Sequence, residues 1–289
     1  MTRVKQGHLA GTWYAGTAAL LRRQVDELLA QAGEPWHGGP LAGIVVPHAG
    51  YQYSGATAAR AYRSVAGGGY RRIVLLAPSH YLRYRGAAVL DVDAFLTPLG
   101  EVMVDRAALD TLAADPLVAA DHRPFEQEHS LEIQLPLLQR VLPDTAVVPL
   151  LLSDLSVEEA QRFAGLLRRL AGPQSLFVVS SDFTHYGERF DYLPFPPTGP
   201  DSVRAHLREL DMGAIERVLA GDLLGFRRYV AETGATICGQ MPIAAFLAWA
   251  ADGAALPGTL LGYTTSLDLT GDFEHSVSYA ALAFARASI

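Results

Sequence analysis

The segment that decides the fold is Leu41-Ala-Gly-Ile-Val-Val46, which is followed directly by Pro47-His48-Ala49-Gly50-Tyr51. A short, wholly apolar run that ends in turn residues is typical of a strand buried on both faces. The same arrangement occurs twice more, where Ile73–Ala77 leads to His80 and Leu176–Ser181 leads to Asp182 and His185. Three predicted strands therefore each place a histidine just beyond their carboxyl ends.

The rest of the chain alternates between apolar runs and helical patterns. Buried strands are predicted at Leu41–Val46, Arg72–Ala77, Ala146–Leu152, Leu176–Ser181, Thr259–Tyr263 and Val277–Phe284. Helices are predicted at Thr17–Ala32, Ser54–Val65, His129–Leu142, Ser156–Ala171, Ser202–Ala220 and Gly239–Ala251. This alternation predicts an α/β fold, with a mainly parallel or mixed central sheet and helices on both faces.

Local signals refine these boundaries. Thr17 is a predicted N-cap, and Ser156 with Glu159 forms a predicted capping box. An antiparallel excursion is predicted for Ala87–Asp93 and Glu101–Val104, joined by Leu96-Thr-Pro-Leu-Gly100. The proline-rich stretch Leu193–Pro200 suits either a domain linker or a surface loop. We favour the loop, because the strand pattern continues beyond it, and so expect residues 1–289 to form a single domain.

Composition limits the function. Half of the 289 residues are hydrophobic, 18% are charged and the formal net charge is -7, which describes a folded protein and argues against nucleic acid or an anionic membrane as a partner. No apolar run approaches the roughly 18 residues of a membrane helix, and the N-terminus does not resemble a signal peptide. One cysteine cannot form an internal disulfide, so we expect a cytoplasmic protein.

The histidines beyond the strands predict a metal site. The carboxyl ends of parallel strands form one edge of a sheet, where ligands bind. A single histidine after a strand is more often a hydrogen-bonded turn residue, so the prediction rests on the set. Cys238 lies at a predicted helix start, where the helix dipole lowers the pKa of a thiol, although a buried, inert cysteine fits equally well. Together His48, His80 and Cys238 would hold one mononuclear Fe(II), Cu or Zn ion.

Other residues suit supporting roles. Asp182 and His185 are close enough in sequence to act as an acid–base or orienting pair. In Glu128-His-Ser-Leu-Glu132, His129 is expected to line the same edge, whereas Glu128 and Glu132 are expected to face water. Aromatic residues suited to wall a pocket are Trp13, Tyr14, Tyr51 and Tyr53.

A set of motifs resembles the Memo family, known in prokaryotes as AmmeMemoRadiSam system protein B. The motifs occur in family order over nearly the whole chain. They are Ala10-Gly-Thr-Trp-Tyr-Ala15, Val46-Pro-His-Ala-Gly-Tyr51, Tyr53-Ser-Gly55, Ala77-Pro-Ser-His80, Glu128-His-Ser-Leu-Glu-Ile-Gln-Leu-Pro136, Ser180-Ser-Asp-Phe-Thr-His-Tyr186, Cys238-Gly and Gly262-Tyr-Thr-Thr-Ser266.

The resemblance implies a fold similar to that of the extradiol, ring-cleaving non-heme iron dioxygenases. It implies a metal, with Fe(II) or Cu favoured, at His48, His80 and Cys238, and a catalytic role for His185. The other residues that it implies line the pocket are Asp182, Arg189, Tyr53 and Trp13. It also implies association with radical-SAM and AMMECR-type proteins. Cys238 replaces the carboxylate ligand of the dioxygenases, so ring cleavage does not transfer directly.

The leading hypothesis is therefore a metal-dependent redox enzyme that acts with O2 on a small organic substrate. His185 would move protons, and Arg189 would bind an anionic group. A non-catalytic module that binds metal or a peptide on the same scaffold is the first alternative. A zinc hydrolase is the second.

Overall fold

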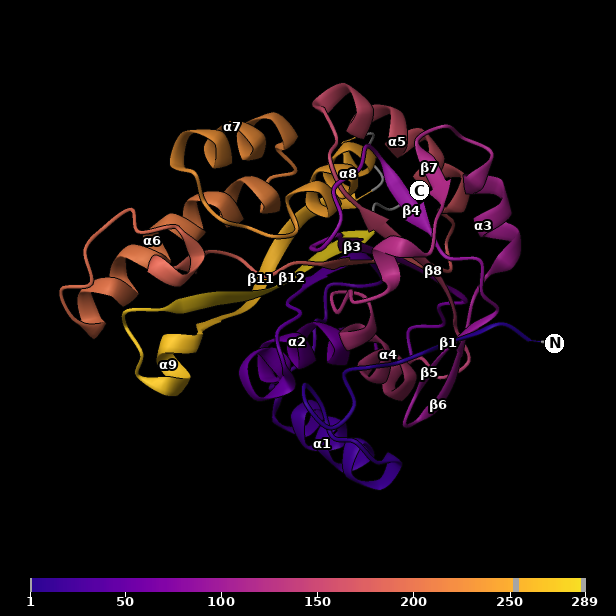
Figure 1. The fold of residues 1–289 in the computed structure, drawn as a ribbon, viewed down its shortest axis with the longest axis horizontal. Coiled ribbons are helices and arrows are strands. Elements are labelled where there is room, and N and C mark those ends of the chain that lie inside the picture. Colours follow the sequence, from indigo (N-terminus) through magenta and orange to yellow (C-terminus); the bar gives the residue numbers. More distant parts are fainter. Residues whose placement is uncertain (1, 252–254, 287–289) are drawn as a thin grey trace.

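The structure, a computed structural model, describes residues 2–251 and 255–286 (Figure 1). Nine strands of this described part form one mixed central sheet. In spatial order they are β10 (His185–Tyr186), β12 (Ser276–Arg286), β2 (Leu41–Val46), β9 (Ser175–Ser180), β3 (Arg72–Pro78), β8 (Ala146–Leu152), β4 (Ala87–Val89) and β7 (Val118–Ala120), with β11 (Ala255–Thr265) also paired to β12. Strands β2, β9, β3 and β8 are mutually parallel, whereas β10, β11 and β12 form antiparallel pairs at one side. The predicted mixed α/β fold is confirmed.

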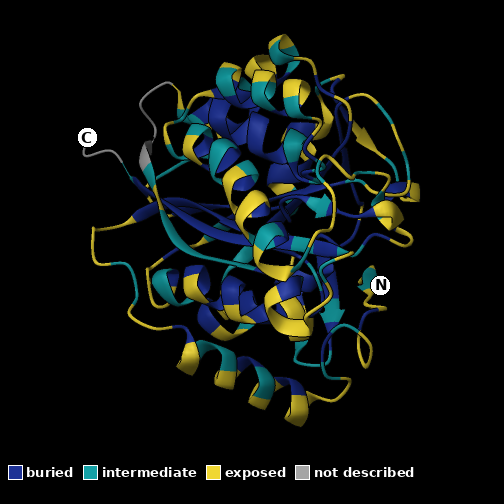
Figure 2. Cartoon of the chain, turned by 90° about the vertical axis from the view of Figure 1, so that its left-hand side faces the viewer, coloured by how far each residue is buried: buried dark blue, intermediate teal, exposed yellow. Residues whose placement is uncertain are grey.

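Helices cover both faces of the sheet, which lies between them as a buried layer (Figures 1 and 2). One face carries α1 (Ala18–Gln31), α2 (Tyr51–Val65) and α4 (Leu135–Val141), and the other carries α5 (Val157–Leu170) and α8 (Gln240–Ala250). Outside these layers lie α3 (Arg106–Ala113), α6 (Pro200–Leu219), α7 (Leu223–Thr233) and α9 (Ser266–Thr270). None of the described helices combines the length and apolarity that crossing a membrane requires.

The predicted strands all exist, but the prediction that Thr259–Tyr263 is buried was wrong. This segment of β11 has an exposed Thr259 and half-buried residues 260–263, because β11 pairs with β12 outside the main strand order of the sheet. All six residues of β2 are buried, as are all six of β9, which matches the continuous apolar runs in the sequence. The predicted caps are also confirmed: the side chain of Thr17 accepts the N–H of Leu20, and Ser156 with Glu159 forms a capping box. The stretch Leu193–Pro200 is a loop that ends at the start of α6.

Two further local predictions were wrong. The antiparallel hairpin is built from β5 (Ala94–Thr97) and β6 (Gly100–Met103), and it pairs with β1 (Val4–Gln6) in a separate small sheet. Strand β4, at the start of the predicted excursion, joins the central sheet. The predicted helix His129–Leu142 is α-helical only in α4 and is preceded by a 3-10 turn, Glu132–Gln134. The N–H of Gln134 bonds the carbonyl of Leu131 in the 3-10 pattern, and Pro136 at the start of α4 has no N–H with which to continue an α-helical ladder backwards.

Candidate metal centre

Three adjacent parallel strands deliver the centre of the site. Strand β9 lies between β2 and β3, so the segments that follow these strands meet at one edge of the sheet. They carry His48 after β2, His80 after β3 and Asp182 after β9. The backbone N–H of His48 donates to Asp182 Oδ1 at 2.7 Å, which ties two of these segments directly together.

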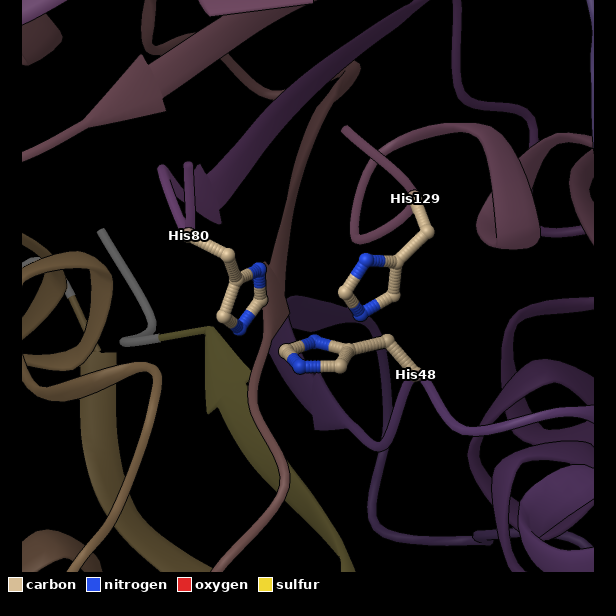
Figure 3. A group of neighbouring side chains, drawn as sticks. All are labelled: His48, His80 and His129. Carbon is tan, nitrogen blue, oxygen red and sulfur yellow. The ribbon is translucent and has the colours of Figure 1, made fainter. Parts of the chain in front are cut away.

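His48, His80 and His129 form a compact group, which we call the imidazole cluster. One ligand nitrogen from each ring lies within 4.8 Å of the other two, a spacing that allows all three to hold a single metal ion. Figure 3 shows the three rings converging from separate parts of the chain. The ring centroids of His80 and His129 are 4.5 Å apart and stacked, and His48 meets both rings edge-on.

The outer ring nitrogens of His48 and His80 are held by protein groups. Nδ1 of His48 lies 2.9 Å from the Ser180 hydroxyl, and Nδ1 of His80 lies 2.8 Å from Glu128 Oε1. Each ring therefore has its Nε2 left to face a ligand, which is the usual arrangement of metal-binding histidines. His129 differs, because its buried Nδ1 has no hydrogen-bond partner among the described residues.

Burial keeps two imidazoles of the cluster, His48 and His129, neutral. Burial, followed by the neighbouring imidazoles, lowers the pKa of His48 well below its ordinary value. Burial lowers the pKa of His129 to about 4. Burial would raise the pKa of Glu128, but its hydrogen bond and charge interaction with His80 outweigh this and lower it to about 2. Neutral imidazoles such as those of His48 and His129 carry the free lone pairs that a cation needs.

Cys238 lies beside the cluster, with Sγ 3.0 Å from His48 Nε2. It directly precedes Gly239, the N-cap of α8. Burial, with a further contribution from the charge of Asp182, raises the pKa of this thiol well above its ordinary value. Of the two alternatives that the sequence leaves open for Cys238, a thiolate favoured by the helix start and a buried thiol, the structure favours the buried thiol, because loss of hydration outweighs the helix dipole. A bound cation would be needed to deprotonate it.

A cavity of about 560 Å³ adjoins the cluster. It brings together the predicted ligands His48 and His80, but not Cys238, and the predicted pocket residues except Tyr14 and Tyr51. These two aromatics lie in the hydrophobic core instead, where their hydroxyls donate to Glu132 and to the carbonyl of Ile133. The lining includes Trp13, His48, Tyr53, His80, His129, Asp182, His185 and Arg189, together with Phe190, which was not predicted. The Trp13 ring packs 4.6 Å from the His129 ring, so the N-terminal segment forms one wall.

His185 and Asp182 do not pair with each other. Nδ1 of His185 lies 3.0 Å from the carbonyl oxygens of Phe183 and Thr236. Carbonyls only accept, so Nδ1 carries the proton and Nε2 is the basic nitrogen in the neutral ring. Asp182 instead accepts the N–H of His48, and burial raises its pKa to about 7.

The expectation that Glu128 and Glu132 face water was wrong. Their exposed fractions are 5% and 6%. Glu128 holds His80, whereas Glu132 accepts the backbone N–H groups of His8 and Leu9 and the hydroxyl of Tyr14. The available signal was the apolar context of Leu131 and Ile133, which places neighbouring polar residues in a buried segment.

Comparison with known proteins places the chain in a family. Residues 5–283 match the model of the Memo-like proteins. The chain is 34% identical to Protein MEMO1 of Xenopus tropicalis and 33% identical to Protein MEMO1 of Homo sapiens, in both cases over 94% of each chain. It is 32% identical to the memo-1 homolog of Caenorhabditis elegans, over 94% of this chain and 80% of that protein. An uncharacterized Escherichia coli K12 protein, JW3007, superposes with a TM-score of 0.45 at 15% identity, over 84% of this chain and 99% of that one. The chain belongs to the Memo-like protein family.

Proposed function

We propose that this protein binds one transition-metal ion at the imidazole cluster and acts on a small organic substrate in the adjoining cavity. The observation that carries the proposal is the convergence of three imidazole nitrogens within 4.8 Å beside a cavity of about 560 Å³. A concave site with a few polar groups and perturbed pKa values is the usual form of an active site.

The residues present fit a metal ion. His48 and His129 are held neutral by burial, and the buried Nδ1 of His129 has no hydrogen-bond partner among the described residues. Imidazole donors, with or without a thiolate, favour Fe(II), Cu or Zn over Mg or Ca. His48 and His80 are the two constant donors of the proposed site, and either Cys238 or His129 supplies the third. Such an ion, when bound, would supply redox or Lewis-acid chemistry.

The protein's own groups would handle protons and orientation. His185 lines the cavity with a protonated Nδ1, so its Nε2 is suited to accept a proton from a substrate hydroxyl or water. Arg189 is exposed at the cavity and forms no ion pair with any residue in the described ranges, which leaves its guanidinium available to an anionic group. Trp13, Tyr53 and Phe190 supply apolar walls that limit water access.

We favour redox chemistry with O2 on a small organic substrate, on the strength of the family resemblance and the adjoining cavity. The test is metal analysis of protein purified without added metal or chelator, followed by O2 uptake with reductant and candidate catechols, aerobically and anaerobically. Substrate-dependent O2 uptake that requires Fe or Cu supports the proposal. Bound zinc with hydrolytic turnover would favour a zinc hydrolase instead. Bound metal with no turnover on any substrate would favour a non-catalytic binding module. Absence of a stoichiometric metal after reconstitution would overturn the site itself.

The proposed partners rest on the family resemblance alone. Association with radical-SAM and AMMECR-type proteins remains a prediction, to be tested by affinity purification from the native organism.

A further inference from the structure

Asp211 is a buried acid with no role in the proposed site. It lies on α6 with an exposed fraction of 0%, and within residues 2–251 and 255–286 no cationic side chain forms a salt bridge with it. Its Oδ1 accepts the backbone N–H of Thr184 at 3.1 Å, and its Oδ2 accepts the hydroxyl of Tyr263 at 2.7 Å. A buried carboxylate is costly without such hydrogen-bond partners. What needs an explanation is why this carboxylate is placed to accept the N–H of Thr184 in particular.

The explanation lies in the Phe183–Thr184 peptide group. Its N–H donates to Asp211, and its carbonyl, on Phe183, accepts from Nδ1 of His185 at 3.0 Å. A peptide group is planar, with the N–H and C=O fixed relative to each other. The orientation that Asp211 imposes on the N–H therefore also sets the direction of the Phe183 carbonyl, one of the two carbonyls, with that of Thr236, that hold the His185 ring.

We infer that Asp211 is a positioning residue for His185, acting through the Phe183–Thr184 peptide. By fixing that peptide it keeps the proton on Nδ1 of His185 and leaves Nε2 unprotonated toward the cavity. The importance of this hydrogen-bonded arrangement for turnover rests on the proposed function, but the arrangement itself needs no metal. A carboxylate acceptor also polarises the peptide, which makes the Phe183 carbonyl a stronger acceptor than an isolated one.

Tyr263 is a second anchor of this hydrogen-bond network. The motif that contains Tyr263, Gly262-Tyr-Thr-Thr-Ser266, contributes no residue to the imidazole cluster. The Tyr263 hydroxyl bonds Asp211 and also lies 3.3 Å from the Ser278 hydroxyl. The backbone of Ser278 in turn bonds Thr184 O and Phe183 N–H, at 2.9 and 2.8 Å. Asp211 and Ser278 therefore both form hydrogen bonds with the backbone of Phe183 and Thr184, the two residues that precede His185.

The experiment reads the tautomer of His185 in metal-free protein by long-range 1H–15N correlation of histidine-labelled samples. In Asp211→Ala, the ratio of Nδ1-protonated to Nε2-protonated His185 falls by roughly fivefold, the effect of weakening one hydrogen bond. In Asp211→Asn the amide oxygen still accepts the Thr184 N–H, so the tautomer is retained. The Nδ1 proton nevertheless shifts upfield, because the polarising charge is gone. The matched control is Tyr229→Phe, which removes a bond from Tyr229 to Leu210 O on the same helix and leaves the His185 spectrum unchanged.

A folded Asp211→Ala protein with the wild-type tautomer ratio would overturn the inference. If the alanine variant does not fold, Asp211→Asn decides: an Nδ1 proton unmoved from its wild-type position refutes the relay. A purely structural role would lower thermal stability in both variants without changing the His185 spectrum of the folded protein. Because these samples hold no metal, failure of the metal-binding proposal cannot produce either result.

Discussion

Glu128 accepts two hydrogen bonds from one residue, His80: Oε2 takes the backbone N–H at 2.7 Å, and Oε1 takes ring Nδ1 at 2.8 Å. The carboxylate is buried and its pKa is lowered to about 2, so it is ionised at neutral pH. This double contact fixes both the position of His80 and its ring orientation. A carboxylate in this place also makes the opposite ring nitrogen a more basic metal ligand.

Glu128→Gln should therefore weaken metal binding by about 10–100-fold while the protein stays folded. The amide supplies one acceptor oxygen, so it cannot satisfy the backbone N–H and ring Nδ1 of His80 as the carboxylate does. Affinity is measured by competition with a chromophoric chelator. Glu126→Gln is the matched control, because Glu126 is exposed and pairs with the equally exposed His122. Equal affinities for the two variants would remove Glu128 from the site.

Cys238→Ser is expected to lower metal affinity by at least tenfold with the fold intact. A hydroxyl is nearly isosteric with a thiol but is a far poorer ligand for borderline metals. The closeness of Sγ to His48 Nε2, 3.0 Å, puts the thiol within reach of an ion bound to that ring. Cobalt substitution provides a second readout, since a thiolate ligand adds an intense near-ultraviolet band. Full metal occupancy in Cys238→Ser, with occupancy lost in His129→Gln, would make His129 the third ligand instead.

Glu132→Ala should destabilise the N-terminal segment that carries Trp13. The carboxylate accepts the N–H groups of His8 and Leu9 at 2.9 Å each and the Tyr14 hydroxyl at 2.7 Å. Removal leaves these donors unpaired, which should cost about 2–3 kcal/mol of unfolding free energy. Tyr14→Phe removes a single donor and should cost about 1 kcal/mol. Urea denaturation measures both, and faster amide exchange at His8 and Leu9 localises the effect. Unchanged exchange there would contradict this anchoring role.

His185→Ala should keep the metal and abolish any turnover that the protein shows. Its ring is held by backbone carbonyls and not by the imidazole cluster, so metal binding does not depend on it. General-base catalysis by a positioned histidine typically contributes 10²–10⁴-fold to a rate. Metal content and turnover are measured on the same sample. Simultaneous loss of both would make His185 a ligand, and the roles of the cluster residues would have to be reassigned.

The sequence predicts the parts of the site that depend on strand ends. His48, His80 and Asp182 each follow an apolar run, and parallel strands bring their carboxyl ends together whatever the details of the loops. Glu128 and Glu132 escaped prediction because their partners lie 48 residues and more than 115 residues away. A short polar segment before an apolar run is typical of a solvent-exposed helix start. Only the distant partners of Glu128 and Glu132 show that this one is buried.

The direction of the pKa change at Cys238 could not be predicted from the sequence for a similar reason. Its position before α8 is visible in the sequence, and a helix start does favour a thiolate. Burial is decided by packing against His48 and Asp182, from segments 190 and 56 residues away. The local effect is worth less than the loss of hydration, so only the folded structure gives the sign of the pKa change.

Two groups of the metal centre, His129 in the cluster and Asp182 next to it, should give the metal-free protein opposite responses to acid. The folded pKa of His129 is about 4, below the ordinary value near 6.5, so between these values only the unfolded chain binds that proton. The contribution of His129 to stability therefore falls as pH drops from 7 to 5, by about 2 kcal/mol. Asp182 has a folded pKa of about 7, above the ordinary value near 3.9, so in this range the folded protein holds the extra proton. Its contribution rises on acidification, again by about 2 kcal/mol.

The two substitutions should therefore shift the pH dependence of stability in opposite directions. Relative to wild type, His129→Gln loses less stability between pH 7 and pH 5, because it lacks the site that protonates only on unfolding. Asp182→Asn loses more, because it lacks the proton that stabilises the folded state. Urea denaturation with a chelator present, at both pH values, gives the four free energies that each comparison needs. A shift of the same sign in both variants would mean that burial does not control these pKa values, and that the electrostatic description of the site is wrong.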